Sequence, residues 1–178
     1  MNKSILIAFL CLIFNTSWAQ TERTDILKIN PLSGIFETGS VFYEHKIDNK
    51  HSWQLGLAYV GYTSTDIQYS GWIVTPEYRI YLHQKALSGI YIGPFLRYQN
   101  FNLTNSDNAT GNYSSFGGGV VIGHQWVYRK GFVLDLFAGP AYNGGKTKYY
   151  NGLATFSGPG FGIDGVGLRA GLSLGFGF

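Results

Sequence analysis

Charged residues are scarce in this sequence. Asp, Glu, Lys and Arg make up 13% of its 178 residues, whereas a typical soluble domain contains about 25%. The formal net charge is only +3, a basic bias too small to indicate a nucleic-acid partner. The deficit of charge suggests instead that much of the outer surface does not face water.

Cysteine is nearly absent as well. The single cysteine, Cys11, lies in an apolar segment of residues 5–14, which follows a lysine and precedes Ser17-Trp18-Ala19. A basic start, a short apolar core and small residues before the cleavage point are typical of a secretory signal peptide. We therefore expect residues 1–19 to be a signal peptide. Residues 20–178 would then form one domain without disulfide bonds or thiolate metal sites.

Long hydrophobic runs are missing from the rest of the chain. No later apolar run approaches the roughly 20 residues of a membrane-spanning helix, and no helical periodicity of apolar residues appears. Aromatic residues are abundant at 17%, and glycine occurs 25 times. Low charge, many aromatic residues and many glycines, without a hydrophobic helix, are typical of a transmembrane β-barrel.

The clearest strand pattern is the last one, residues 166–178. Its apolar residues occupy every second position and end on Phe176 and Phe178, with small or polar residues between them. Thirteen alternating residues exceed the usual strand of about five or six and suffice for the roughly nine to eleven that cross a bilayer. This ending resembles the assembly signal of bacterial outer-membrane barrels, which implies recognition by the barrel-assembly machinery. The alternative is an edge strand of a soluble sandwich.

Seven further stretches alternate in the same way and are separated by turn residues. The expected connections near residues 48, 85 and 130 are short, while those near 66, 108 and 153 are long. Short periplasmic turns and longer extracellular loops are characteristic of outer-membrane barrels. We therefore predict an all-β, eight-stranded antiparallel transmembrane β-barrel with up-and-down meander topology. The expected strands are 24–30, 35–46, 52–62, 71–83, 89–102, 114–128, 132–143 and 166–178.

Charged residues gather on the face opposite the apolar one. The interior of an eight-stranded barrel is filled by side chains, and buried charges are costly unless they are paired. We therefore predict a paired interior network, with a proton or ion path as the alternative. Its expected members are Glu77, Arg79, Arg97, Asp135 and Arg169, joined by Glu44 if the second strand faces the same way.

The longest expected connection, residues 144–162, carries basic and aromatic side chains. These are Lys146, Lys148, Tyr149 and Tyr150, and we expect them to contact lipopolysaccharide phosphates or an extracellular partner of unknown identity. The four histidines lack metal-ligand spacing, and the Gly-x-Gly-x-x-Gly match at 160–165 does not open a helix after a strand. We expect neither a metal nor a cofactor, and no Ser-His-acid set is readable.

Three short blocks carry a family resemblance. The blocks L-K-I-N-P-L at 27–32, P-E-Y-R at 76–79 and G-H-Q-W at 123–126 resemble a family of uncharacterised bacterial outer-membrane barrels, classed as domain of unknown function 3575. The resemblance implies a fold and a location in the outer membrane, among its lipids and lipopolysaccharide, but no activity. The leading hypothesis is a non-enzymatic barrel that is structural or makes contacts through its outer loops. A lipid-modifying enzyme and a narrow channel are the alternatives.

Overall fold

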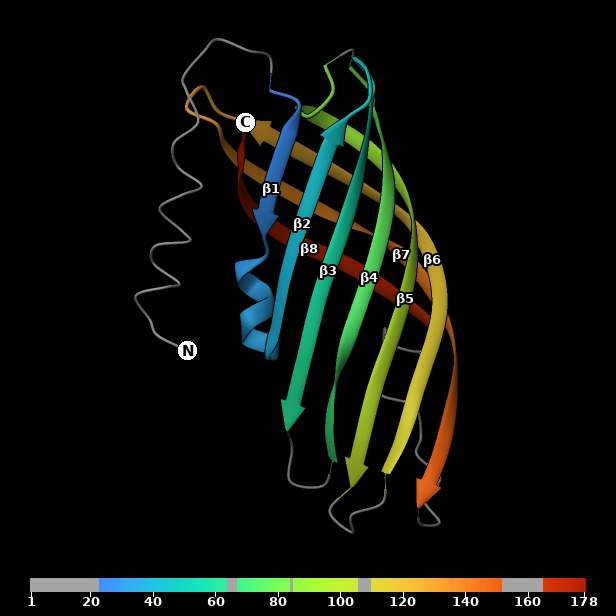
Figure 1. Cartoon of the computed structure of the whole chain (residues 1–178). Helices are drawn as coiled ribbons and strands as arrows, with labels where there is room; N and C mark the ends of the chain where they lie inside the picture. Colours follow the sequence, from blue (N-terminus) through green and yellow to red (C-terminus); the bar gives the residue numbers. More distant parts are fainter. Residues whose placement is uncertain (1–22, 64–66, 84, 106–109, 152–164) are drawn as a thin grey trace, which may run out of the picture.

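The computed structural model describes residues 23–63, 67–83, 85–105, 110–151 and 165–178. The chain forms a closed barrel in which each strand pairs with the next and β8 pairs with β1, as Figure 1 shows. All neighbouring pairs are antiparallel, which confirms the predicted all-β, eight-stranded meander. The strands are β1 (Asp25–Ile29), β2 (Thr38–Lys46), β3 (His51–Thr63), β4 (Ile67–Tyr81), β5 (Gly89–Asn105), β6 (Thr110–Val127), β7 (Phe132–Asn151) and β8 (Gly165–Gly177).

The two ends of the barrel differ. The C-terminal residue, Phe178, lies at the same end as the connections 47–50, 82–88 and 128–131, and we call this the terminal end. Tight-turn geometry explains the short connections there: Gly131 has a φ of +93° and donates its N–H to the Tyr128 carbonyl at 2.9 Å. We call the opposite end the far end. The predicted signal peptide lies outside the described residues.

Strands β4 to β7 extend further toward the far end than predicted, because the pattern of polarity inverts there. Phe101, Leu103 and Tyr113 point inward and are buried, whereas their strand neighbours Asn102 and Asn112 point outward. The predicted strands are therefore too short, because the prediction assumes that apolar residues face outward along the whole strand. The predicted segments 71–83, 89–102, 114–128 and 132–143 correspond to Ile67–Tyr81, Gly89–Asn105, Thr110–Val127 and Phe132–Asn151.

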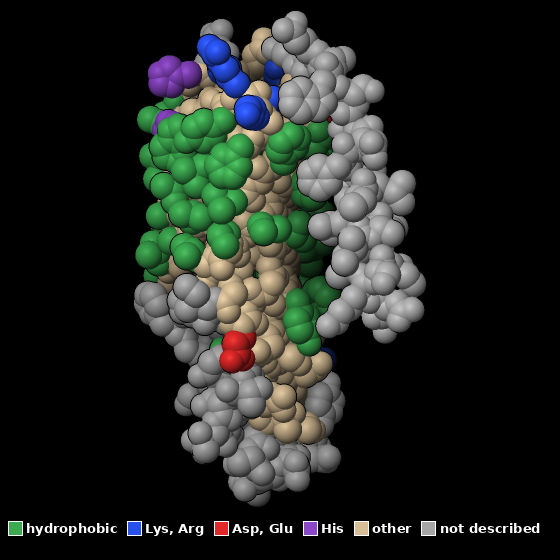
Figure 2. All heavy atoms as spheres, turned by 90° about the vertical axis from the view of Figure 1, so that its left-hand side faces the viewer, with side chains coloured by type: hydrophobic (Ala, Val, Ile, Leu, Met, Phe, Trp, Pro, Cys, Tyr) green, Lys and Arg blue, Asp and Glu red, His purple; other side chains and the backbone are tan. Residues whose placement is uncertain are grey.

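An apolar belt covers the outside of the barrel on the terminal side of this inversion. Figure 2 shows it from one side, with hydrophobic side chains gathered over the upper part of the molecule. Five exposed aromatic side chains at similar register levels edge the belt toward the far end, and we call them the far aromatic row: Tyr59, Trp72, Tyr98, Phe116 and Tyr142. Among the described residues, no helix is long and apolar enough to cross a membrane.

The first strand is short, which explains the unusual connection near Pro31. The side chain of Asn30 accepts the N–H of Leu32 at 3.0 Å and begins a 3-10 helix, η1 (Pro31–Phe36). The helix ends at Glu37, whose φ is +51°. Consequently β2 begins at Thr38 rather than at residue 35. Among the described residues, β1 pairs with only the last part of β8, from Leu174 to Gly177.

The barrel interior has three layers. An apolar cluster of Ile26, Leu87 and Val133 fills the terminal end, where the 82–88 connection folds against the barrel mouth. A second apolar cluster fills the far end, with Val60, Phe101, Leu103 and Tyr113 buried and Tyr69 and Ile73 packed against them. Charged and polar side chains occupy the layer between these two clusters, together with buried aromatic rings.

Candidate functional site

Two cations share the same acceptors at the centre of the middle layer. The Nζ of Lys28 lies 2.6 Å from Glu44 Oε2 and 3.0 Å from Asp135 Oδ2. The Nη1 of Arg79 lies 3.1 Å and 2.9 Å from the same two oxygens. Gln125 Oε1 accepts from both cations, at 2.6 Å from Lys28 and 3.2 Å from Arg79. All five side chains are buried, so two cations and two carboxylates neutralise each other away from bulk water.

Hydroxyl groups satisfy the remaining carboxylate oxygens. Ser52 and Tyr81 donate to Glu44 Oε1 at 2.6 Å and 2.7 Å, and Tyr91 donates to Asp135 Oδ1 at 2.9 Å. Both carboxylates therefore have each of their oxygens bound. Such complete satisfaction offsets the desolvation of buried ions, which otherwise costs several kcal/mol per ion.

The network also contacts the ring of Tyr91 and the connection 82–88. The Arg79 guanidinium carbon lies 4.1 Å from the centroid of the Tyr91 ring. The Nε2 of Gln125 donates to the Leu87 carbonyl at 2.9 Å and to the Tyr81 hydroxyl at 3.1 Å. These contacts hold the 82–88 connection against the charged layer and close the terminal end around it.

Glu77 carries the network toward the far end. Its Oε1 accepts from Arg79 Nε at 2.6 Å, and its Oε2 accepts from Arg169 Nη1. The Arg169 guanidinium carbon also lies 4.4 Å from the ring centroid of Phe95 and 4.9 Å from that of Phe137. Arg169 thus closes the charged layer with one ion pair and two cation–π contacts.

Five of the six predicted interior residues meet in this network: Glu44, Glu77, Arg79, Asp135 and Arg169. The prediction for Arg97 is wrong, because Arg97 forms no ion pair within the described part of the chain. Arg97 faces Gly117 across the β5–β6 ladder, and both oxygens of Glu77 are already bound by other arginines. No unshared carboxylate is left for it.

Sequence reasoning missed Lys28. Its neighbours Leu27 and Ile29 are exposed on the outer face, so simple alternation places Lys28 inside. The available signal was this alternation, in a strand of only five residues. The omission matters because Lys28 supplies the cation that balances Glu44 and Asp135 beside Arg79.

The pairing pattern predicts specific energetic coupling. We expect Arg169→Leu and Glu77→Leu to show a coupling energy of about 1 kcal/mol or more in a double-mutant cycle. Arg169→Leu and Asp135→Leu should couple by less than about 0.5 kcal/mol, as sites without a shared contact do. Urea unfolding in lipid vesicles measures both cycles. Equal coupling in the two cycles would contradict the assignment of Glu77 as the partner of Arg169.

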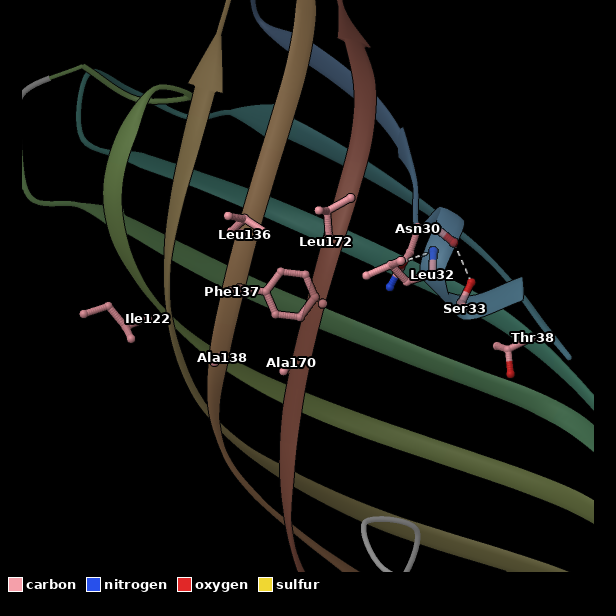
Figure 3. Close-up of a pocket in the computed structure, with 11 residues that line it drawn as sticks. Asn30, Leu32, Ser33, Thr38, Ile122, Leu136, Phe137, Ala138, Ala170 and Leu172 are labelled. Carbon is pink, nitrogen blue, oxygen red and sulfur yellow. Dashed lines mark hydrogen bonds between the residues drawn. The ribbon is translucent and has the colours of Figure 1, made fainter. Parts of the chain in front are cut away.

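A groove of about 690 Å³ lies on the outer surface where η1 meets β8. Figure 3 shows its lining, with apolar side chains of β7 and β8 such as Leu136, Ala138 and Leu172, and with polar side chains at and around η1, namely Asn30, Ser33 and Thr38. The hydroxyl of Ser33 donates to the Asn30 carbonyl at 2.6 Å. None of the residues that line the groove is a histidine or an acid, so the lining lacks a base to activate this serine.

Of the remaining predicted residues, those whose side chains are described lie on the outer surface. Lys146 and Lys148 belong to strand β7 rather than to a loop, and both are exposed. Tyr149 and Tyr150 also belong to β7, but their side chains lie outside the described part of the structure. Phe176 and Phe178 are exposed at the terminal end, 50% and 53% respectively.

The described residues contain no group of three or more His, Cys, Asp or Glu side chains that could hold a metal ion. The histidines instead make local contacts. His45 Nδ1 lies 2.8 Å from Asp25 Oδ1, His51 Nδ1 lies 2.8 Å from Asp48 Oδ2, and the His124 ring packs on Trp126 at 4.0 Å.

Comparison with known proteins identifies a family. The family model described as "Protein of unknown function (DUF3575)" matches residues 5–158, which is most of the chain. This match confirms the resemblance indicated by the three sequence blocks. No curated protein and no solved structure matches the chain.

Proposed function

We propose that this chain, which belongs to the DUF3575 family of proteins of unknown function, is a non-enzymatic β-barrel of the bacterial outer membrane that makes contacts through the outer part of its strands. The single observation that carries this proposal is the inversion of polarity at the far aromatic row. On the terminal side of the row, apolar side chains face outward and charges face inward. Beyond it, asparagines face outward and aromatic residues face inward.

A bilayer explains both halves of this pattern. A transmembrane barrel carries an outward apolar band about 25 Å tall, with aromatic residues at its edges and a polar interior. A strand that continues into water must present polar residues outside and bury apolar ones inside. A barrel wholly in water would leave the apolar belt exposed, far beyond the few hundred Å² of contiguous apolar surface that soluble monomers show.

The lengths of the strands, rather than those of the connections, support an orientation. The expected long connections near 66 and 108 are only 64–66 and 106–109, because β3 to β6 continue beyond the far aromatic row. Outer-membrane barrels extend further on the extracellular side than on the periplasmic side, so the terminal end would face the periplasm and the extended far ends of the strands would project from the cell. The apolar clusters at both ends of the charged layer also argue against a narrow channel through the described interior.

The location is testable by fractionation. We expect the protein to sediment with the outer membrane and to migrate faster in detergent gels when it is not boiled, because transmembrane barrels resist unfolding by detergent. Electrophoresis of boiled and unboiled samples from each fraction measures both properties. Recovery as a periplasmic protein with no heat-dependent shift would contradict the membrane proposal.

Lipopolysaccharide phosphates are the contact that we propose for the exposed lysines. Lys146 pairs in register with Ser114, and Lys148 pairs with Asn112. Asn112 donates to the side-chain oxygens of Asn100 and Asn102 at 3.1 Å and 3.2 Å, which orders a polar surface beside the lysines. This surface begins directly beyond Phe116 and Tyr142 of the far aromatic row, at the depth where lipid phosphates would lie.

Removing the two lysines should weaken lipopolysaccharide binding. A basic residue near an anionic membrane surface contributes about 1 kcal/mol, so Lys146→Gln with Lys148→Gln should reduce affinity about thirtyfold. Titration of the purified protein, followed by its tryptophan fluorescence, measures the change. The matched control is Lys50→Gln with Lys130→Gln at the terminal end. Equal weakening in the control, or none in the test variant, would contradict the proposed contact.

A further inference from the structure

The middle layer of the interior holds one more cation than acids. The described residues place four basic side chains there, Lys28, Arg79, Arg97 and Arg169, against the three acids Glu44, Glu77 and Asp135. The three guanidinium groups cannot lose their protons in a protein and together balance the three carboxylates. The ammonium group of Lys28, which pairs with Glu44 and Asp135, then gives the layer a net positive charge.

Arg97 is the cation left without a partner. Its Nε is buried and has no hydrogen-bond partner, and Arg97 forms no ion pair with any described residue. The residue as a whole is partly buried. The guanidinium carbon lies 5.6 Å from the centroid of the Phe95 ring, which supplies a weak contact but no counter-charge.

The surroundings of Arg97 favour an anion. Arg169 contacts the same Phe95 ring, at 4.4 Å, so two guanidinium groups flank one ring. The nearest acid, Glu77, is bound on both oxygens by Arg79 and Arg169. The other polar groups at this level are neutral, such as the amide of Gln99, which donates to the Ser115 hydroxyl at 3.0 Å.

We propose that a small inorganic anion, of the class that includes chloride and phosphate, binds inside the barrel beside Arg97 and Arg169. Within the described part of the chain, the Nε–H of Arg97 is a buried donor without a hydrogen-bond partner, as is Nη2 of Arg79. An uncompensated charge in a low-dielectric interior is strongly unfavourable, and an anion removes that penalty while the protein stays folded. The inference concerns the closed barrel and holds whether or not the barrel lies in a membrane.

Anion-dependent stability tests the proposal. The protein is refolded in neutral detergent and unfolded with urea at constant ionic strength, with chloride, bromide or phosphate replacing gluconate, a larger organic anion that serves as the reference. Because a ligand that binds only the folded state stabilises it, we expect the urea midpoint of the natural protein to rise with small-anion concentration. In gluconate alone, Arg97→Gln should be at least as stable as the natural protein, since it lacks the excess charge.

Arg97→Gln should also abolish the dependence on small anions, and the matched control Arg129→Gln, on an exposed turn, should retain it. No dependence in the natural protein, or an equal dependence in Arg97→Gln, would overturn the proposal. Should Arg97→Gln fail to fold, a crystal of the natural protein soaked in sodium bromide decides the question. An anomalous peak beside Arg97 supports the site, and its absence at full occupancy elsewhere in the crystal refutes it.

Discussion

Replacing Arg79 with leucine lowers the free energy of unfolding by about 3–5 kcal/mol, the expected cost of removing one partner from a buried ion pair. Arg79 contacts all three interior acids, Glu44, Glu77 and Asp135. Its removal leaves Lys28 as the only cation bound to Glu44 and Asp135. Since a typical domain is stable by about 5–15 kcal/mol, this single change removes a large share of the total.

Urea unfolding in lipid vesicles measures the loss. The matched control is Arg129→Leu, which removes an exposed arginine from the connection 128–131 and should change stability by no more than about 0.5 kcal/mol. If Arg79→Leu unfolds at the same urea concentration as the natural protein, the interior is hydrated and its charges are not held together by burial.

Deleting Phe178 should prevent most of the protein from assembling, whereas Phe178→Tyr should assemble almost normally. Two properties of this residue support the expectation. Its side chain is the terminal aromatic group of the proposed assembly signal. Its backbone joins β8 to β1, because its N–H donates to the Asp25 carbonyl at 2.9 Å and its carbonyl accepts from the N–H groups of Thr24 and Asp25 at 3.2 Å and 3.1 Å.

The variant Phe178→Ala separates these two roles. It keeps the backbone hydrogen bonds and removes the ring. If the ring is the signal, alanine behaves like the deletion; if the backbone closure dominates, alanine behaves like tyrosine. The folded fraction is read from unboiled gels after expression. A deletion variant that assembles as fully as the natural protein would remove Phe178 from both roles.

The number and order of the strands can be predicted from the alternation of residues along the sequence. The positions at which the strands end cannot be predicted in this way. Alternation of apolar and polar residues marks the parts of the strands that carry the apolar belt, such as Val166 to Phe178, and turn residues separate them. The same rule fails beyond Phe101, where the apolar residues move from the outer to the inner face of the barrel. The point at which the apolar residues change face can be located only from the far aromatic row, and the position of that row depends on the register between strands.

The prolines show that the sequence can predict an interrupted ladder but not which ladder is interrupted. Because proline lacks an N–H, Pro76 and Pro94 each predict an interruption in a strand ladder. In the structure, the ladder between β4 and β5 is interrupted around both prolines. Between the pair Val74 with Tyr98 and the pair Ile80 with Ile92, the one remaining pair is Glu77 with Phe95. The ladders on the other sides of both strands run without a break. Which of a strand's two ladders a proline interrupts depends on the orientation of the strand, and only the structure shows that orientation.

For the interior network too, the sequence predicts which residues are inside but not which of them pair. The alternation of side chains along the strands correctly predicted that five charged residues lie inside the barrel, opposite the apolar outer face: Glu44, Glu77, Arg79, Asp135 and Arg169. Which cation binds which acid depends on the stagger of strands far apart in sequence: Lys28 on β1 reaches Asp135 on β7, 107 residues away. The isolation of Arg97 likewise emerges only when the competing partners of Glu77 are known.

The central claim is that the barrel crosses the outer membrane with its far end outside, and single-cysteine labelling of intact cells tests it most directly. With Cys11 replaced by alanine, single cysteines are placed at Lys146 beyond the aromatic row, at Val120 in the apolar belt, and at Lys130 in a terminal turn. A membrane-impermeant maleimide should label Lys146→Cys in intact cells, Lys130→Cys only after the outer membrane is opened, and Val120→Cys in neither. Labelling of Lys130→Cys in intact cells, or equal labelling of Val120→Cys and Lys146→Cys, would contradict the account.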